Sequence, residues 1–342
     1  MNKKFNKAMS KIRSAASIKD CFHPNKDECV MPIKSAHSLQ RQGSLKTLEK
    51  TDDKGNAFLY VHSEREHNFK NAFYDLKPVG RRIATTFDGF CSFHDTELFK
   101  IIENEPEITD INNDEHLFLH SYRSFAIAYH NKMEHLKLYE SKDSEINEIL
   151  DQMYTKSQRN DALEGVKMAI NDLKKPKEAI DILLNSNNFS GLEYFAIEYD
   201  YTAPVGCASF ITPHSLPNGK MIQMNAYSNT QSSIITTVLP FSDRTVVILA
   251  ALSDDQLACD ILNSIDDIKY ELKQQKFLSF FIFEGAENVV VSPHFIDIKS
   301  LKWRKDYCEL INHIADNHTP FLNYNEKTFH INYFDKSNAL LH

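Results

Sequence analysis

The chain has 342 residues, of which 42% are hydrophobic and 11% aromatic, so it can bury more than one core and is not a disordered protein. Its 47 acidic and 39 basic residues give a net charge of −8, which argues against a protein that coats nucleic acid through bulk charge. Six cysteines are too few for a disulfide framework. The N-terminus has no apolar signal segment and no apolar run is long enough to cross a bilayer, so we predict a cytoplasmic protein without membrane contact.

The first hundred residues divide into a basic arm and an irregular segment. Residues 1–19 have no acidic residue, which indicates a solvated tail, a short helix or an arm that contacts phosphate groups. Residues 20–100 are rich in His, Cys, Gly and Pro, with short strands predicted at 57–63 and 81–86. Because apolar periodicity is weak there, this segment needs a staple, and a metal ion serves that purpose in a reducing compartment.

A helical region is predicted from about residue 114 to 186. In 115–139, large apolar residues recur at spacings of three to five, which predicts one buried helix face: Leu117, Tyr122, Phe125, Tyr129, Met133 and Leu136. Helices are also expected over 145–158 and 162–175, and another begins near Pro176. Such long, charged helices form a bundle or a connector.

The last part of the chain reads as a mixed α+β domain. Strands are predicted at 193–201, 207–214, 221–228, 233–241 and 244–252. A capped amphipathic helix is predicted over 254–275. No glycine-rich phosphate loop, Rossmann glycine pattern or G-x-S-x-G motif occurs, which excludes the usual nucleotide hydrolysis and hydride-transfer sites.

These elements predict an α+β fold in three segments. Residues 1–113 would form a zinc-stapled module with its basic arm, 114–188 a helical connector or bundle, and 189–342 a regulatory or binding domain.

Two pairs of metal-ligating residues stand near the N-terminus. Cys91 and His94 lie in "FCSFHD" with the spacing of a zinc half-site at the start of a helix, and Cys21 and Cys29 close the loop "CFHPNKDEC". We therefore predict a structural zinc ion bound by these four residues, with His23 left open as a substitute for either loop cysteine. The alternative is a chance grouping in a chain with 15 histidines.

Further polar residues accompany these pairs. Arg81 and Arg82 precede the second pair and are candidates to contact phosphate oxygens, or are surface charges. His116, His120 and Arg123 align near one helical face, which we expect to pack under the zinc module, with substrate contact as the alternative.

The order Cys…Cys…"AHSLQ"…"FCSFHD" resembles the zinc-bound, treble-clef type of HNH (ββα-metal) endonuclease, over about residues 20–100. The resemblance implies that a strand carries His37 as the general base. It also implies that Asp95, directly after the last zinc ligand, holds a catalytic Mg²⁺ or Mn²⁺ ion. The acidic residue that this family usually has before the base histidine is Ala36 here.

The sequence thus favours metal-dependent phosphodiester hydrolysis of DNA or RNA. The other segments would sense, regulate, oligomerise or bind a protein partner, an arrangement that resembles bacterial anti-phage defence effectors and toxins. The alternative, favoured by Ala36, is a non-catalytic zinc-stabilised protein that binds nucleic acid or protein. In that case His37 is a capping or buried histidine, and Asp95 is a first-turn carboxylate stabilised by the helix dipole.

Overall fold

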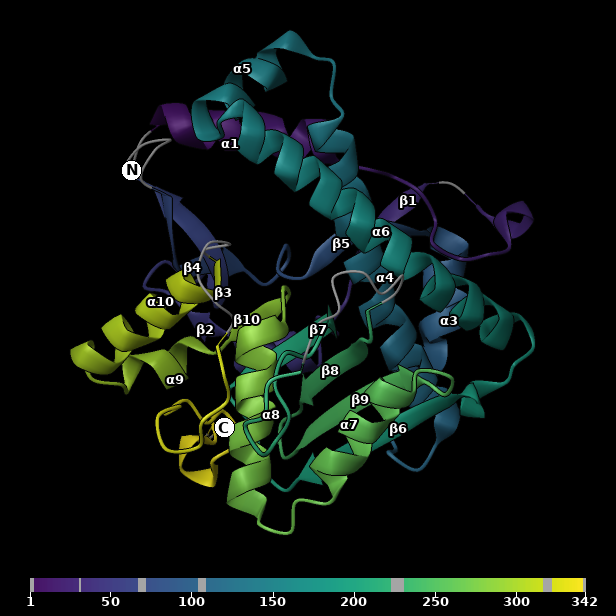
Figure 1. Ribbon diagram of the computed structural model, residues 1–342, viewed down its shortest axis with the longest axis vertical. Helices are drawn as coiled ribbons and strands as arrows, with labels where there is room; N and C mark the ends of the chain where they lie inside the picture. The colour runs from purple at the N-terminus through teal and green to yellow at the C-terminus, as the bar shows by residue number, and fades with distance from the viewer. Residues whose placement is uncertain are drawn as a thin grey trace.

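The computed structural model describes residues 3–30, 32–66, 72–103, 109–222, 231–315 and 322–340. The expected α+β fold is confirmed: the structure combines a small two-stranded sheet, a large antiparallel sheet, and helices on both faces of the large sheet (Figure 1). Within these ranges no helix combines the length and the apolarity that a bilayer span requires.

The two-stranded sheet and the helix that follows it in the chain position the zinc-ligand candidates. After α1 (Lys3–Ala16), a loop containing the short 3₁₀ helix η1 (Lys26–Glu28) leads to β1 (Ile33–His37). This strand pairs antiparallel with β5 (Thr86–Cys91), and α3 (Ser92–Glu103) begins directly after β5. The strand predicted at 81–86 is wrong except for its last residue: residues 81–85 form a turn that leads into β5.

A long insertion separates β1 from β5, and its strands belong to the large sheet. It contains α2 (Ser44–Leu48), β2 (Lys50–Thr51), β3 (Ala57–Glu66) and β4 (Ala72–Gly80). The strand predicted at 57–63 is therefore confirmed as β3. Since β3 pairs with β10 (Val289–Val291), one sheet contains strands from the first and the third predicted segments. The boundaries predicted for the three segments stay a prediction.

The eight-stranded sheet has the order β2-β3-β10-β7-β8-β9-β6, and β4 pairs with β3. Its C-terminal strands are β6 (Leu192–Tyr199), β7 (Val205–Ile211), β8 (Ile234–Pro240) and β9 (Thr245–Leu252). They confirm four of the five strands predicted there. Most of the fifth, 221–228, lies outside the described residues, and Met221 forms only an isolated bridge to Ser215.

Helices cover both faces of this sheet. Along β9, residues alternate between two cores: Val247, Leu249 and Ala251 pack with α7 (Gln256–Asp266) and α8 (Glu271–Gly285), and Val246, Ile248 and Ala250 pack with α4 (Asp114–Tyr139). This alternation follows from the two-residue period of a strand. Figure 1 shows α7 and α8 in front of the sheet and α4 behind it. Beyond the sheet follow the short α9 (Pro293–Asp297) and α10 (Leu301–Ala315).

Three helix boundaries differ from the prediction. The two helices expected on either side of Pro176 form one helix, α6 (Lys156–Asn185), because Leu173 and Ile180 hold both halves in the core with α4. The helix expected over 145–158 ends as α5 (Ser144–Met153), since a capping box at Thr155 starts α6. The helix expected over 254–275 breaks between α7 and α8, which lets both helices pack on the sheet.

Candidate metal centre

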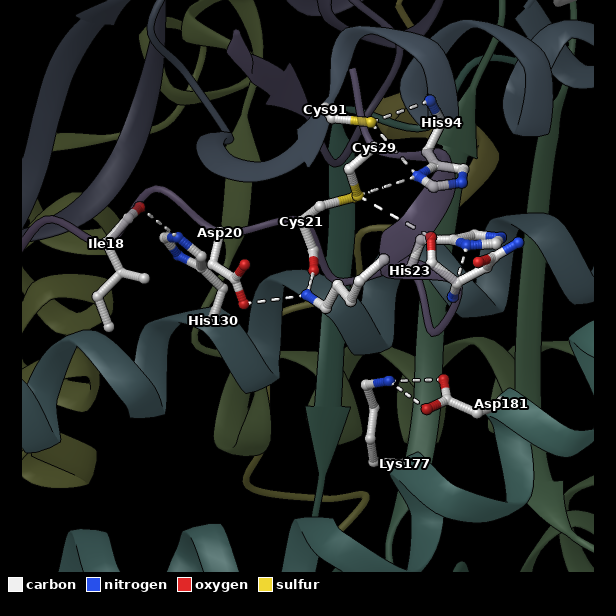
Figure 2. Close-up of polar contacts among 12 residues, drawn as sticks. Ile18, Asp20, Cys21, His23, Cys29, Cys91, His94, His130, Lys177 and Asp181 are labelled. Carbon is white, nitrogen blue, oxygen red and sulfur yellow. Dashed lines mark hydrogen bonds and ion pairs between the residues drawn. The ribbon is translucent and has the colours of Figure 1, made fainter. Parts of the chain in front are cut away.

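Cys21, Cys29, Cys91 and His94 converge at the start of α3. Their ligand atoms all lie within 4.8 Å of one another. The Nδ1 atom of His94 is 3.4 Å from the Cys21 sulfur, 3.7 Å from that of Cys29 and 3.3 Å from that of Cys91 (Figure 2). A tetrahedral zinc ion with ordinary bond lengths separates sulfur and nitrogen ligands by about 3.6 Å. The four residues therefore form a Cys₃His group that could hold a structural zinc ion, as the sequence predicted.

Backbone contacts bring the two ligand pairs together. The amide of Phe22, next to Cys21, donates to the carbonyl of Gly89 in β5 at 2.6 Å, and the amide of Ser92 donates to Pro32 at 3.2 Å. Cys91 is the last residue of β5, and His94 is in the first turn of α3. The strand-to-helix junction thus presents one pair to the loop that carries the other.

The segment before Cys21 is fixed to α4. The amide of Ile18 donates to Glu134 at 3.0 Å. The carbonyl oxygen of Ile18 lies 3.1 Å from Nε2 of His130 (Figure 2). Next to Cys21, the Phe22 ring packs against four aromatic rings of β5 and α4: Phe90, Tyr122, Phe125 and Tyr129. These contacts place the Cys21 end of the loop against α4 and β5.

Two of the three thiols, Cys21 and Cys29, ionise readily only beside a cation. The pKa of Cys91 is lowered instead, because burial, which raises it, is outweighed by backbone hydrogen bonds such as that from the His94 amide. Burial, together with the neighbouring Cys21 and Cys91 thiols, raises the pKa of Cys29 to about 12. Burial also raises the pKa of Cys21. Three adjacent thiolates repel one another, and a bound Zn²⁺ supplies the opposing charge. Four protein ligands complete a tetrahedron, which is the arrangement of a structural rather than a catalytic zinc site.

Two neighbours support His94. A carboxylate oxygen of Glu28 is 3.8 Å from its Nε2 atom, on the side opposite the sulfurs, where an acidic group favours Nδ1 as the metal ligand. His23, the substitute ligand left open by the sequence, instead stacks on His94 with the ring centroids 3.7 Å apart. Its Nδ1 accepts a hydrogen bond from the amide of Asn25 at 3.2 Å, so His23 lies beside the ligand set.

His37 is the last residue of β1, opposite Thr86 in β5. Its Nε2 atom is buried and has no hydrogen-bond partner among the described residues. Burial lowers the pKa of His37, while a hydrogen bond to the backbone of Arg81 opposes that shift. The imidazole is thus neutral at pH 7, with Nε2 as the nitrogen left to accept a proton.

Asp95 is half-buried in the first turn of α3. Burial raises the pKa of this carboxyl, and the positive charge of Arg123 opposes the shift. Arg123 and Glu103 act electrostatically on both Asp95 and His37, so the two candidate catalytic groups lie in one electrostatic environment.

The structure adds Glu103 to this environment, a residue that the sequence reading did not single out. Its carboxylate accepts a hydrogen bond from Nη2 of Arg123 at 2.7 Å. The signal was available, because Asp95, Phe99 and Glu103 recur every four residues and so share one face of a helix. His116, His120 and Arg123 are all buried on α4, and Arg123 contacts α3.

The two arginines predicted to contact nucleic acid differ in their surroundings. Nη1 of Arg81 lies 3.1 Å from Glu49 in a half-buried ion pair, whereas Arg82 is exposed. Of the two, Arg82 has the side chain that solvent reaches freely. Their contact with phosphate stays a prediction.

No family model, no curated protein and no solved structure matches the chain.

Proposed function

We propose that residues 20–103 form an HNH-like module that hydrolyses phosphodiester bonds in nucleic acid. One observation carries this proposal: a strand–strand–helix unit surrounds the Cys₃His group, with His37 at the end of β1 and Asp95 in the first turn of α3. A strand that carries His37 and a helix that carries Asp95 in its first turn support the resemblance, and the departure from it is the insertion of α2 and β2–β4 between the two strands.

The chemistry assigned to the two residues suits their environments. A neutral imidazole whose Nε2 has no partner among the described residues can take a proton from an attacking water molecule that reaches this buried atom. A carboxylate in a helix first turn is a hard ligand, which suits Mg²⁺ or Mn²⁺, and such an ion stabilises charge on a scissile phosphate. The four-ligand zinc group would hold β1 and α3 in place and take no part in the reaction.

Replacing His37 with alanine is expected to lower the rate of cleavage by about 10²- to 10⁴-fold, because the general base is lost. The measurement is cleavage of plasmid DNA and of RNA in Mg²⁺ and in Mn²⁺. The rate of the wild type should rise with pH through the pKa of His37 and level off below the usual range for histidine, since burial lowers that pKa.

His294→Ala serves as the matched control, because His294 is an exposed histidine on α9 and should leave the rate unchanged. If the wild type cleaves neither substrate with either ion, the nuclease proposal is wrong. The non-catalytic alternative then holds. It is favoured by Ala36, which is 3% exposed and places a methyl group in the core where the family usually has an acidic residue.

The basic helix α1 supports nucleic acid as the partner. It buries Phe5, Ala8, Ile12 and Ala16 and exposes basic side chains on the other side: Lys3, Lys7 and Arg13. Its C-terminal end leads directly into the loop that carries Cys21. A duplex that contacts this face through phosphate groups would therefore lie next to the proposed module.

Replacing Lys3, Lys7 and Arg13 together with glutamine is expected to weaken binding to duplex DNA equally for all sequences. The slope of log K against log salt is negative, and each lost phosphate contact reduces its magnitude by about 0.9. The slope is measured by fluorescence anisotropy over a salt series. The control replaces three exposed lysines outside α1, Lys302, Lys305 and Lys327, and should keep the wild-type slope. Equal slopes in all three proteins would rule out α1 as the contact.

A further inference from the structure

The strand β6 is the last strand on one side of the large sheet (Figure 1). It pairs with β9 in one continuous register, from Leu192 opposite Leu252 to Tyr199 opposite Thr245. Within the described residues no other strand pairs with it, and none of its backbone groups bonds to any element but β9. Half of the amides and carbonyls of an edge strand point away from its partner. The outer side of β6 therefore presents a row of hydrogen-bonding groups.

The middle of β6 is accessible to solvent. Ala196 and Ile197 are half-buried, whereas the residues opposite them in β9, Ile248 and Val247, are 0% exposed. These two pairs lie on opposite faces of the sheet, so both faces are closed at β9. The exposure of β6 thus comes from its position at the edge.

The other side of the sheet carries the features with which proteins protect an edge. There, β4 contains Lys77 and Pro78, and α10 lies against it, with Sγ of Cys308 donating to Asp75 at 3.3 Å. The neighbouring β2 has only two residues. By contrast, β6 is eight residues long and has no lysine, no proline and no bulge. A strand of this kind can accept a further strand from a partner.

A cavity of about 290 Å³ lies beside the start of β6, between this strand and α7. Polar side chains of β6, of the turn after β9 and of α7 line it: Glu193, Ser253, Gln256 and Asn263. Glu193 is exposed and forms no ion pair in the part of the chain that the structure describes. The cavity therefore has an uncompensated carboxylate at its mouth.

The charge of this cavity is negative. Cys259 of α7 lies in its wall, and burial raises the pKa of this thiol. The carboxylates of Glu193, Asp255 and Asp260 raise it further, so all three act at the same place. Among the described residues that line the cavity there is no lysine or arginine. A cationic side chain is the complement of such a site.

We propose that β6 is a docking edge for an extended, basic segment of a partner protein, which adds to the sheet as a further strand and places a lysine or arginine side chain in the cavity beside Glu193. Residues directly opposite each other in adjacent strands share a face, so a residue opposite Glu193 points to the α7 side, where the cavity lies. A second copy of this chain would instead bring a second acidic edge against the first. The inference does not depend on the proposed nuclease function.

The first test is the binding of a fluorescent eight-residue peptide of alternating lysine and valine, the length of β6, to the full-length protein. Fluorescence anisotropy should show binding of this peptide and none of the same peptide with glutamate in place of lysine. Glu193→Lys should weaken binding by about fivefold or more. Glu148→Lys makes the same change of charge at an exposed position on α5 and should leave the affinity unchanged.

The second test shows whether the peptide binds as a strand. Only alternate amides of an added strand face β6, so of two peptides methylated on the lysine or on the valine backbone nitrogens, one should bind about tenfold more weakly and the other as before. Hydrogen exchange should slow at alternate amides of β6 when the unmethylated peptide binds. Equal binding of the two methylated peptides, or no binding of the lysine peptide, would overturn the inference. A dimer of the free protein with β6 amides already protected would overturn it in favour of a second copy.

Discussion

Replacing Cys91 with serine is expected to abolish zinc binding and to unfold the module that contains β1, β5 and α3. A structural zinc ion contributes about 10–16 kcal/mol of binding free energy in zinc-finger peptides at pH 7. That is comparable with the whole stability of an ordinary domain, about 5–15 kcal/mol. A serine hydroxyl stays protonated and cannot replace the thiolate. Elemental analysis should show about one zinc ion per wild-type chain and none in the variant.

The control for this prediction is Cys259→Ser, because Cys259 lies on α7, away from the ligand group. It should keep the zinc content and the unfolding temperature of the wild type. Hydrogen exchange should show faster exchange in β1 and α3 for Cys91→Ser only. A wild-type protein without zinc, or a Cys91→Ser protein that retains it, would contradict the assignment of the centre.

Replacing Phe90 with alanine is expected to lower the free energy of unfolding by about 3–5 kcal/mol, the usual cost of removing a buried phenylalanine. Phe90 is fully buried. Its ring contacts one ring each from the loop before β1, β5, α3 and α4: Phe22, Phe87, Phe99 and Tyr122. The cavity would lie where the zinc module meets α4. Urea denaturation followed by fluorescence and circular dichroism measures the loss.

This variant also separates packing from metal binding, since Phe90 is adjacent to Cys91 but offers no ligand atom. Phe90→Ala should retain zinc while losing stability. Ile83→Ala, in the turn before β5, removes a side chain that is 67% exposed and should change stability by less than about 0.5 kcal/mol. A loss below about 1 kcal/mol in Phe90→Ala would show that the module and α4 do not share a core.

The Cys₃His group could be predicted because the spacing within each of its two pairs is local, although the contact between the pairs is not. Cys91 and His94 are three residues apart at a helix start, and their spacing alone indicates a half-site. His23 was harder to place, since the choice between a ligand and a neighbour depends on which way its ring turns. The stacking of that ring on His94 is a tertiary contact with no signature in the sequence.

The sheet could be predicted only strand by strand. The β-branched and apolar runs of β8 and β9 mark them as strands, and the short polar turn between them marks them as neighbours. The pairing of Val61 in β3 with Val290 in β10 has no such signal, because 229 residues separate the partners. Pro176 was misleading for a related reason, since packing on α4 maintains a helix that the local sequence favours ending.

The pairing of β3 with β10 also sets an order of events during synthesis. All four residues of the Cys₃His group lie before α4 in the chain, whereas β10 lies within its last sixth. At 5–20 residues per second, the ribosome needs about 10–40 s to add the roughly 200 residues between His94 and Val291. During this interval the metal centre can close while the β3 edge at Tyr60 and Val61 still lacks its partner strand. An unpaired edge accepts strands from other chains, so the nascent protein is most prone to aggregate after its metal site is complete.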